Sequence, residues 1–450
     1  MSTVNQPENL QDLTAEATEL LQALLRIDTT NLPGNETAAA ELLERYLTAN
    51  GVDCELVARE PERANLIARL PGSDPSAPAL LLLGHSDVVP AEPESWTYPP
   101  FAGTLDEEGW IWGRGALDMK NEVASRAVAM AALARSGEQL KGDLVLLVVA
   151  DEEDGTAEVG ATWIVHERPE LATSYVINEG GGERFELSDG RTIVRVTVGE
   201  KATIRVRVTA LGRPGHASKP YGEDRTVPRL ATLITRLHAY KPRWRLIPET
   251  ERMLEALVGY RPGDDLDQAI YAAAALHPEL EMSVPAACAS TIAPTRLFAS
   301  EALNVMPGRA SVDCDCRVVP GTSEEQLLAE LRDALGEDLP YELEVIEPFT
   351  GGTVSTTESP LFEACREFLA KHDPGTILVP GIGIGFTDSH FMRERFGAVA
   401  YGLWPYLHTP LEVLETVHGH DERVHSDDLG YTTRFHIEVA RTLLGAGVND

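Results

Sequence analysis

Carboxylate and imidazole side chains follow the apolar runs of this sequence. Three runs end in this way: 79–83 leads to His85 and Asp87, 144–150 leads to Asp151 through Asp154, and 175–177 leads to Glu179. Consecutive acids behind a buried strand are electrostatically costly unless a cation lies among them. The pattern therefore predicts a cation site to which several segments contribute.

The ligand types indicate which cation this site would hold. Imidazoles and carboxylates without thiolates suit zinc, with cobalt or manganese as alternatives, in catalytic sites that retain a water. One carboxylate can bridge two ions about 3.5 to 4 Å apart, and such a pair can hold a hydroxide and polarise a carbonyl. Glu152 and Glu153 are adjacent, so one can bind metal while the other stays free as a general base. Spacing alone leaves open which residue has which role.

Two further features belong to this predicted site. His85 and Asp87 are two residues apart, so an extended backbone places both side chains on one side and lets the aspartate orient the imidazole. Asp118 lies in a glycine-punctuated loop, 113–120, that precedes an alanine-rich segment. Each motif alone is a modest signal, and their shared placement after apolar runs predicts the site.

Other chemistries fit the sequence less well. The glycine run 381–385 is not a dinucleotide fingerprint, because its third glycine comes one residue too early. The segment 84–88 lacks the closing glycine of a serine hydrolase elbow. The scattered cysteines argue against a thiolate zinc site or a disulfide framework and indicate a reducing compartment: Cys54, Cys288, Cys314, Cys316 and Cys365.

Regular elements must position these residues, and the apolar periodicity predicts them. Helical spacing marks 14–27, 37–49 and the alanine-rich 121–134. Nearly continuous apolar runs mark strands covered on both faces: 79–83, 144–150, 175–177 and 398–403. This alternation predicts an α/β domain with a largely parallel sheet, in which ligands bind beyond the carboxyl ends of the strands.

Near Val196 the pattern of apolar residues changes from α/β alternation to a strand-rich pattern. This change predicts a second, smaller α+β domain inserted into the first. Its expected elements are a strand at 203–208, a helix from Val227, and strands at 297–303 and 310–318, the last with Cys314 and Cys316 packed on one face. The predicted parts are the catalytic domain at 1–196 and 350–450 and the inserted lid or dimerisation domain at 197–349.

The composition argues against several classes of partner. The chain has 450 residues, enough for two or three domains at about 150 residues each. Its formal net charge of −33 would repel nucleic acid and anionic membrane surfaces. No apolar run approaches the ~18 residues of a membrane span, and the amino terminus is polar and acidic. We therefore expect a cytoplasmic protein with a small-molecule substrate.

Taken in order along the chain, these motifs resemble a known family. The chain is similar to the dizinc metallopeptidases that include aminoacylase, glutamate carboxypeptidase, succinyl-diaminopimelate desuccinylase and carboxypeptidase S. The resemblance covers nearly the whole chain, and the ordered set of segments that carries it is very specific: 25–30, 84–90, 96–100, 113–120, 151–155, 215–218, 304–308, 387–389 and 418–423.

The resemblance implies protein ligands for two zinc ions. Asp118 would bridge the ions, and the Asp118–Met119 peptide bond would be cis. His85 and Glu179 would complete the protein ligands of one ion. Glu153 and His418 would complete those of the other.

The resemblance also assigns roles around the ions. Glu152 becomes the general base, and Asp87 becomes the partner of His85. The family pattern His-x-x-Asp/Asn-Glu selects His418 as the C-terminal ligand, with His420 as the alternative. The general base and the five ligands together imply hydrolytic chemistry.

Residues of the inserted domain are implied in substrate handling. His216 would stabilise the tetrahedral intermediate, often from the partner subunit of a dimer in this family, so a homodimer is expected. Asn304 and Arg317 match positions that contact the substrate in relatives. The planar fork of Arg317 suits a free carboxylate.

A second group matches the substrate end of the pocket, namely Gly385, Thr387 and Asp388. Phe386 separates the glycine from the threonine, which departs from the plainer Gly-Gly-Thr-Asp of many relatives. We expect a hydrolase that cleaves the amide bond of N-acyl amino acids or short peptides next to a free carboxylate. The alternatives are a desuccinylase, deacetylase or dipeptidase of the same family, or a binding protein that retains the fold without catalysis.

Overall fold

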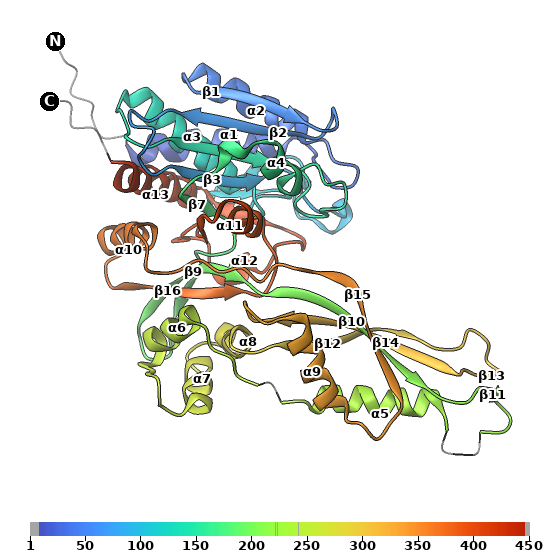
Figure 1. Cartoon of the computed structure of the whole chain (residues 1–450). Coiled ribbons are helices and arrows are strands. Elements are labelled where there is room, and N and C mark those ends of the chain that lie inside the picture. The colour runs from blue at the N-terminus through green and yellow to red at the C-terminus, as the bar shows by residue number, and fades with distance from the viewer. Residues whose placement is uncertain (1–8, 221, 223, 242, 446–450) are drawn as a thin grey trace, which may run out of the picture. The chain divides into compact units, whose positions relative to one another are not determined.

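The computed structural model describes residues 9–220, 222, 224–241 and 243–445. The chain forms two units, whose elements are labelled in Figure 1. The first unit contains the residues up to Val198, Ser355–Pro380 and the residues from Thr387. The second contains Gly199–Val354 and the short segment Gly381–Phe386.

A nine-stranded sheet is centred on the first unit. Its strands are β1 (Asp53–Ala58), β2 (Ala64–Leu70), β3 (Leu80–His85), β6 (Leu144–Val149), β7 (Tyr175–Asn178), β8 (Arg184–Glu186), β9 (Thr192–Glu200), β16 (Thr376–Gly383) and β17 (Val399–Gly402). The order is β1-β2-β6-β3-β7-β17-β9-β16, with β8 beside β9. The central β6, β3, β7 and β17 pair in parallel, and antiparallel strands flank them. The predicted α/β class with a largely parallel sheet is confirmed.

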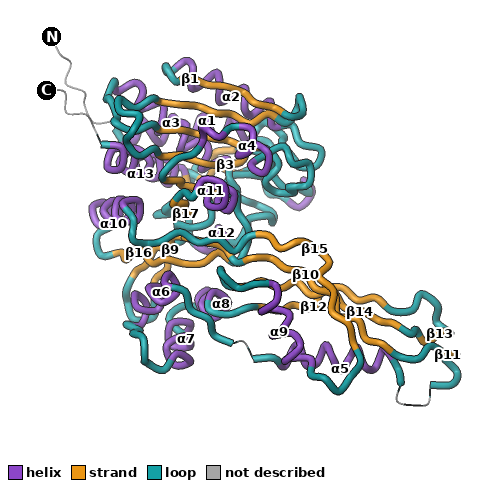
Figure 2. The backbone as a smooth tube through the Cα atoms, viewed as in Figure 1, coloured by secondary structure: helices purple, strands orange, loops and turns teal. Residues whose placement is uncertain are grey.

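Helices cover both faces of this sheet, as Figure 2 shows for its purple and orange segments. The helices of this unit are α1 (Leu10–Leu25), α2 (Glu36–Ala49), α3 (Lys120–Ser136), α4 (Ala161–Glu167), α10 (Pro360–His372), α11 (Ser389–Phe396), α12 (Leu411–Leu414) and α13 (Ser426–Leu444). The apolar side chains of α4 and α11 pack with Leu81 and Leu83 on one face. α3 and α13 contact β3 on the opposite face, where Val123 approaches Gly84.

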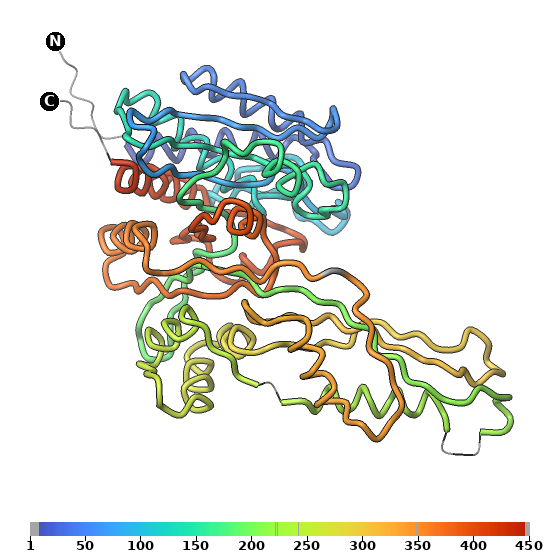
Figure 3. Tube along the Cα trace, viewed as in Figure 1, coloured from blue at the N-terminus to red at the C-terminus, as the bar shows by residue number. Residues whose placement is uncertain are grey.

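The alanine content of α3 has a structural reason. This helix is buried from Lys120 to Leu133 because it packs against the sheet, α1 and α13 at the same time. Small side chains allow such close approach on every side, whereas a helix with one exposed face would repeat its apolar residues every three to four positions and place polar residues between them. α13 comes from the end of the chain and returns to α1 at its beginning, which can be followed by colour in Figure 3.

A small antiparallel sheet also belongs to the first unit. Its strands, in the order β18-β5-β4, are β4 (Thr104–Leu105), β5 (Trp110–Trp112) and β18 (Arg423–His425). β5 leads into the loop that carries Asp118, and β18 leads directly into α13. None of the helices in the described ranges is long and apolar enough to cross a membrane.

The second unit contains a four-stranded antiparallel sheet in the order β12-β14-β10-β15. The strands are β10 (Ala202–Leu211), β12 (Thr291–Phe298), β14 (Arg309–Val318) and β15 (Tyr341–Thr350). A separate two-stranded antiparallel sheet pairs β11 (Gly215–His216) with β13 (Val305–Met306). The helices are α5 (Thr226–Ala239), α6 (Pro248–Val258), α7 (Leu266–Ala274), α8 (Pro278–Ala287) and α9 (Glu324–Leu335).

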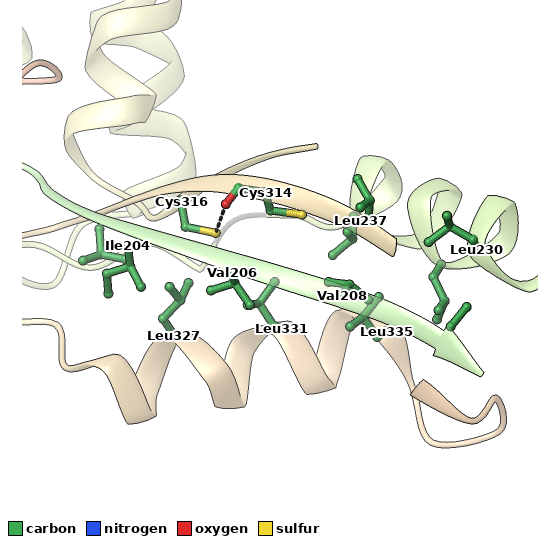
Figure 4. Close-up of a cluster of buried hydrophobic side chains, with 14 of the residues drawn as sticks. Ile204, Val206, Val208, Leu230, Leu237, Cys314, Cys316, Leu327, Leu331 and Leu335 are labelled. Carbon is green, nitrogen blue, oxygen red and sulfur yellow. Dashed lines mark hydrogen bonds between the residues drawn. The ribbon is translucent and has the colours of Figure 1, made fainter. Parts of the chain in front are cut away.

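One face of this sheet carries the core of the second unit, drawn in Figure 4. Leucines from α5 and α9 meet alternate residues of β10 and β14 there. Cys314 and Cys316 lie two residues apart on β14 and are both buried in this core, as predicted. All five cysteines of the chain are free thiols.

The predicted strand at 297–303 is wrong. The strand β12 runs from Thr291 to Phe298, and the chain then turns, with the hydroxyl of Ser300 bonded to the main chain of Ala302. β12 is an edge strand, and its side chains from 293 onward are exposed. The apolar residues of such a strand are not buried in a core, so their positions in the sequence do not show where the strand begins and ends. The three helices α6, α7 and α8 also lie where no individual helix was predicted.

Candidate metal centre

The carboxyl ends of three parallel strands bring the predicted ligands to one edge of the sheet. His85 is the last residue of β3, and it lies opposite Val149 at the end of β6. Asp151 to Glu153 follow β6, and Glu179 follows β7. Such an edge is the usual ligand site of an open α/β sheet.

A first group of three side chains could hold a metal ion. It consists of His85, Asp118 and Glu179, whose ligand atoms all lie within 4.8 Å of one another. His85 Nε2 is 3.1 Å from Asp118 Oδ1 and 3.5 Å from Glu179 Oε2. The imidazole is 1% exposed, so its nitrogen faces the carboxylates rather than bulk water.

A second group shares one residue with the first. It consists of Asp118, Glu153 and His418, again within 4.8 Å. His418 Nε2 is 3.1 Å from Asp118 Oδ2 and 3.1 Å from Glu153 Oε2. Asp118 thus turns one carboxylate oxygen toward each histidine, which is the geometry of a bridging ligand. His420, the alternative C-terminal ligand, is in neither group.

Glu152 belongs to neither group, although it lies beside them. Its Oε2 is 4.0 Å from His85 Nε2. Its neighbour Glu153 has one oxygen in the second group, and its other oxygen, Oε1, is buried without a hydrogen-bond partner. A buried carboxylate with an unused oxygen fits a cation ligand, because such an atom is otherwise costly to desolvate.

The electrostatics of the cluster also fit a bound cation. Burial raises the pKa of Glu152 well above its usual range, with Glu179 as the next cause. Burial also raises the pKa of Glu179 itself. Hydrogen bonds to Asp118 and Glu153 raise the pKa of His418 to about 10. Burial opposes the charged form of His85, but Asp118, Asp87 and Glu179 together outweigh it and raise the pKa of His85 well above its usual value. The donor set therefore concentrates negative charge that a divalent cation would neutralise.

Asp87 does more than orient the imidazole. The Nδ1 atom of His85 lies 3.0 Å from the main-chain oxygen of Asp87 but 3.5 Å from its carboxylate. The carboxylate instead accepts the amide N–H groups of Glu152 at 3.2 Å and Glu153 at 3.1 Å. The Asp87 side chain therefore fixes the turn that presents both glutamates.

A buried network of side chains that was not predicted from the sequence supports this turn. Asn31 Nδ2 donates to Asp87 Oδ2 and to Asp151 Oδ1, both at 3.0 Å. Arg63 donates to Asp151 at 3.3 Å and forms two bonds with Glu36, at 2.6 and 2.7 Å. Asp151 itself has a φ of 61°, a region that is strained for a residue with a Cβ atom. The network holds that strained turn in place.

Glu422 is a further residue whose role was not predicted. Its buried carboxylate accepts the main-chain N–H groups of Gly115 at 3.1 Å, Leu117 at 2.6 Å and Asp118 at 3.1 Å. Arg114 donates to the same carboxylate at 2.5 Å. The Asp118–Met119 peptide bond in this loop is cis, as the resemblance implied. The signal for Glu422 was present, because it lies in the motif that selects His418.

Two of the predicted substrate residues lie in the first unit with the metal ligands. Burial raises the pKa of Asp388 to about 8, an effect that His85 opposes and Glu179 reinforces. The carboxyl group of Asp388 therefore interacts electrostatically with the ligand groups. A Cβ atom at Gly180 would lie 3.7 Å from Thr387, which places the threonine beside the residue that follows Glu179. Gly385 belongs to the second unit.

The remaining predicted residues lie in the second unit. His216 is in β11, and Ala217 N donates to Asn304 O at 3.0 Å, so His216 and Asn304 lie at the same end of the two-stranded sheet. Arg317 is in β14 and donates to Asp315 at 2.7 Å. In the β10–β14 pairing, Arg317 lies opposite Thr203 near one end, whereas the two-stranded sheet of β11 and β13 lies beyond the other end. The structure therefore brings His216 and Asn304 together but not Arg317.

Comparison with known sequences decides the family. Residues 81–442 match the sequence model of peptidase family M20/M25/M40. The matched region is well over half of the chain and contains every candidate ligand named above. The chain belongs to peptidase family M20/M25/M40. The predicted resemblance to the metallopeptidases that include aminoacylase is thereby confirmed.

Individual proteins agree with this family assignment. Aminoacylase-1B of Rattus norvegicus is 27% identical over 418 residues, which is 90% of this chain and 90% of that protein. The M20 metallo-carboxypeptidase Sso-CP2 of Sulfolobus solfataricus has a TM-score of 0.68 at 20% identity and covers 95% of this chain and 99% of its own. The Bacillus subtilis YXEP protein, a dinuclear metal binding peptidase, has a TM-score of 0.62 at 14% identity and covers 97% and 99%.

Membership of the M20/M25/M40 family defines the class of this enzyme. The chain is a metal-dependent hydrolase of amide or peptide bonds, and the prediction of an enzyme is confirmed. The two ligand groups that share Asp118 are its candidate metal site.

Proposed function

We propose that this protein is a dizinc amidohydrolase that releases amino acids from N-acyl amino acids or short peptides with a free carboxylate. One observation carries the proposal: two groups of metal-ligating side chains share Asp118, and Glu152 stands beside them without belonging to either. Because Asp118 belongs to both groups, it could bridge two adjacent metal ions. A free glutamate next to the pair supplies the proton acceptor that hydrolysis needs.

We assign the ligands as two sets. His85 and Glu179 would hold one ion and Glu153 and His418 the other, with Asp118 between them. Imidazole and carboxylate donors favour zinc, and cobalt or manganese would also fit. When bound, the ions would acidify a water and polarise the scissile carbonyl.

In this proposal Glu152 transfers the protons. Its carboxylate accepts a proton from the attacking water and returns it to the amine that leaves, so the residue ends the cycle as it began. The hydrogen bond from the main-chain N–H of Glu152 to the Asp87 carboxylate fixes the backbone at this residue. Only the side chain of Glu152 then has to move. The carboxylate is 12% exposed, so competing bulk water is largely kept from it.

His216 is proposed to stabilise the oxyanion. The amide N–H of Ser218 donates to His216 Nδ1 at 3.1 Å. In the neutral imidazole this bond places the remaining proton on Nε2. His216 therefore presents a ready hydrogen-bond donor, as an oxyanion site requires. Asn304 at the same end of the two-stranded sheet could contribute a second donor.

Geometry within the second unit supports a homodimer with shared sites. Arg309 to Arg317 in β14 span about 26 Å at about 3.3 Å per residue, and His216 lies beyond the Arg309 end. A single acylated amino acid is far shorter than this distance. Arg317 and His216 of one chain therefore cannot contact the same substrate molecule, which supports a site shared between two chains.

The surface of the second unit favours such pairing. Leu297 and Phe298 of β12 are 66% and 41% exposed on an edge strand. Val227 of α5 is 48% exposed. Unpaired strand edges with apolar side chains are where another chain can add. We propose that this lid and dimerisation unit joins two chains through these residues.

The substrate class rests on the relatives. Aminoacylase-1B is similar along nearly the whole chain, which favours N-acyl amino acids. A dipeptidase or a desuccinylase is the second candidate, because structures as different as human carnosine dipeptidase 1 share the fold at a TM-score of 0.63. The intact ligand groups and Glu152 argue against a silent binding protein. A cytoplasmic location remains a prediction from the cysteine pattern.

Metal analysis and a substrate panel test this proposal. Elemental analysis of the purified protein should give two equivalents of zinc per chain, and exhaustive chelation should abolish activity reversibly. Hydrolysis of N-acetyl amino acids should exceed that of dipeptides and of N-succinyl-diaminopimelate. A preference for dipeptides would overturn the aminoacylase assignment, and full activity after metal removal would overturn the mechanism.

A further inference from the structure

A second cluster of metal-ligating side chains lies outside the candidate metal centre. His408, His425 and Asp427 each offer one ligand atom, and these atoms all lie within 4.8 Å of one another. The two imidazole rings are 5.4 Å apart, with their planes inclined by 33°. None of these residues has a part in the chemistry described above.

The three residues come from two segments of the first unit. His408 lies in the loop between β17 and α12. His425 ends β18 and caps the amino terminus of α13, and Asp427 lies in the first turn of that helix. The cluster therefore joins the loop to the start of the helix.

Buried hydrogen bonds hold the two segments in register. The carboxylate of Asp428 accepts the main-chain N–H groups of Leu407 at 2.8 Å, His408 at 2.9 Å and Thr409 at 2.7 Å. The N–H of His425 donates to Thr409 Oγ1 at 3.1 Å. Both histidine backbones are thus fixed relative to each other. An ion that bound here would find its ligands already positioned, which favours affinity.

The tautomer of His425 suits a metal at Nδ1. The amide N–H of Asp427 donates to His425 Nδ1 at 3.3 Å, so in the neutral ring the proton sits on Nε2. The lone pair of Nδ1 accepts this N–H, and Asp427 Oδ2 lies 3.7 Å from the same nitrogen. Nε2 lies on the other side, beside Gly109. A cation at Nδ1 would replace one long hydrogen bond and would need no change of tautomer.

The cluster is open to solvent and carries suitable charge. His408 and Asp427 are exposed, and both line a cavity of about 650 Å³ between α1 and the start of α13. This cavity gives an ion access and leaves room for water in its remaining coordination positions. The amino end of α13 opposes a cation through its dipole, but Asp427 and Asp428 in the first turn offset that partial charge.

We propose that His408, His425 and Asp427 form a peripheral site for one divalent cation of the zinc class, separate from the two ions of the catalytic centre. Two imidazoles and one carboxylate are borderline ligands that suit zinc, cobalt or nickel rather than calcium or magnesium. The bound ion would clamp the loop at 407–409 to α13. Its effect is on stability, because the cluster takes no part in the proton transfers of Glu152.

Zinc binding by the whole protein tests the proposal. The wild-type enzyme and the variants His408→Gln and Asp427→Asn are dialysed to equilibrium against the same buffered free zinc, and bound zinc is measured by elemental analysis. His166→Gln, which changes an exposed histidine of α4, is the matched control. The readout is the difference between proteins, so it does not depend on how many ions the catalytic centre holds.

We expect the wild type and His166→Gln to bind one zinc more than either cluster variant. Loss of one ligand should weaken this site at least about tenfold, as loss of even an indirect partner does at metal sites. Added zinc should also raise the midpoint of thermal unfolding of the wild type more than that of His408→Gln. Equal zinc content in all four proteins would overturn the proposal, as would retention of the extra ion by both cluster variants.

Discussion

The carboxylate of Asp87 accepts the amide N–H of Glu153 at 3.1 Å. The same side chain accepts the N–H of Glu152 and the side-chain amide of Asn31. All three partners are donors, and the carboxylate offers acceptors only. This match fixes the turn that carries one proposed metal ligand and the proposed general base.

Asp87→Asn should therefore disturb the turn rather than the imidazole alone. The new NH₂ group must face at least one donor, so a buried hydrogen bond becomes a repulsive contact. We expect a loss of about 10- to 100-fold in turnover or metal affinity, as for other groups behind metal ligands. Asp74→Asn, which changes an exposed acid, is the control. Steady-state kinetics and metal content check the outcome, and an unchanged turnover with full metal would contradict it.

Glu152→Gln and Glu153→Gln should separate base from ligand. The Glu152 variant loses its proton acceptor but touches neither ligand group, so we expect it to retain metal and lose about 10² to 10⁴ in turnover. The Glu153 variant removes a ligand carboxylate and should lose metal as well. Elemental analysis of both proteins decides the roles. An empty Glu152 variant beside a full Glu153 variant would show that the assignment is reversed.

The part of the site that the sequence predicts follows from strand ends. His85 and Glu179 end or follow apolar runs, and parallel strands bring such residues to one edge whatever the loops between them do. The glycine-punctuated loop also indicated Asp118, but its role as the bridging ligand required the resemblance, because a loop residue has no periodic signal. The structure brings these three within 4.8 Å.

The supporting residues could not be predicted in the same way. Asn31 meets Asp151 across 120 residues, and Arg114 meets Glu422 across 308. A lone asparagine or arginine looks the same in sequence whether it is buried in such a network or solvated on the surface. The bounds of the edge strand β12 were predicted wrongly for a related reason. Its apolar residues face solvent, so their positions in the sequence do not follow from packing against a core.

Lys201 should make the stability of the protein depend on pH. Its Nζ is buried and donates to Ala286 O and Ala289 O at 2.8 Å and to Thr291 Oγ1 at 3.3 Å, with no carboxylate among these partners. Burial lowers the pKa of Lys201 to about 7, and Arg317 adds to this effect. An unfolded lysine has a pKa of about 10.4, so between these values the unfolded chain binds a proton that the folded chain lacks.

This contribution of Lys201 to the free energy of unfolding should rise with pH between about 7 and 10. The free energy of unfolding of the wild type, minus that of Lys201→Met, should increase by up to about 1 kcal/mol per pH unit from pH 7.5 to 9.5. Urea unfolding at several pH values measures it. Lys141→Met, which changes an exposed lysine, should show no such trend. Parallel pH profiles for wild type and Lys201→Met would refute the expectation.

His216→Ala should be nearly inactive while it retains its metals. The residue is outside both ligand groups, and loss of one oxyanion donor lowers turnover by roughly 10² to 10³. Metal content and turnover of the purified variant measure this. A variant that lost metal would indicate a ligand role instead.

Mixing His216→Ala with Glu152→Gln then tests whether the active site is shared between chains. In a mixed dimer, one site combines the intact Glu152 of the first variant with the intact His216 of the second, so that site should work. Random pairing of equal amounts makes half of the dimers mixed, each with one good site, and activity should recover to about a quarter of wild type. If His216 serves its own chain, every site lacks either the base or the oxyanion donor and no activity can return. Native mass spectrometry must show that the subunits have exchanged, and a fully exchanged mixture that stays inactive would exclude the shared site.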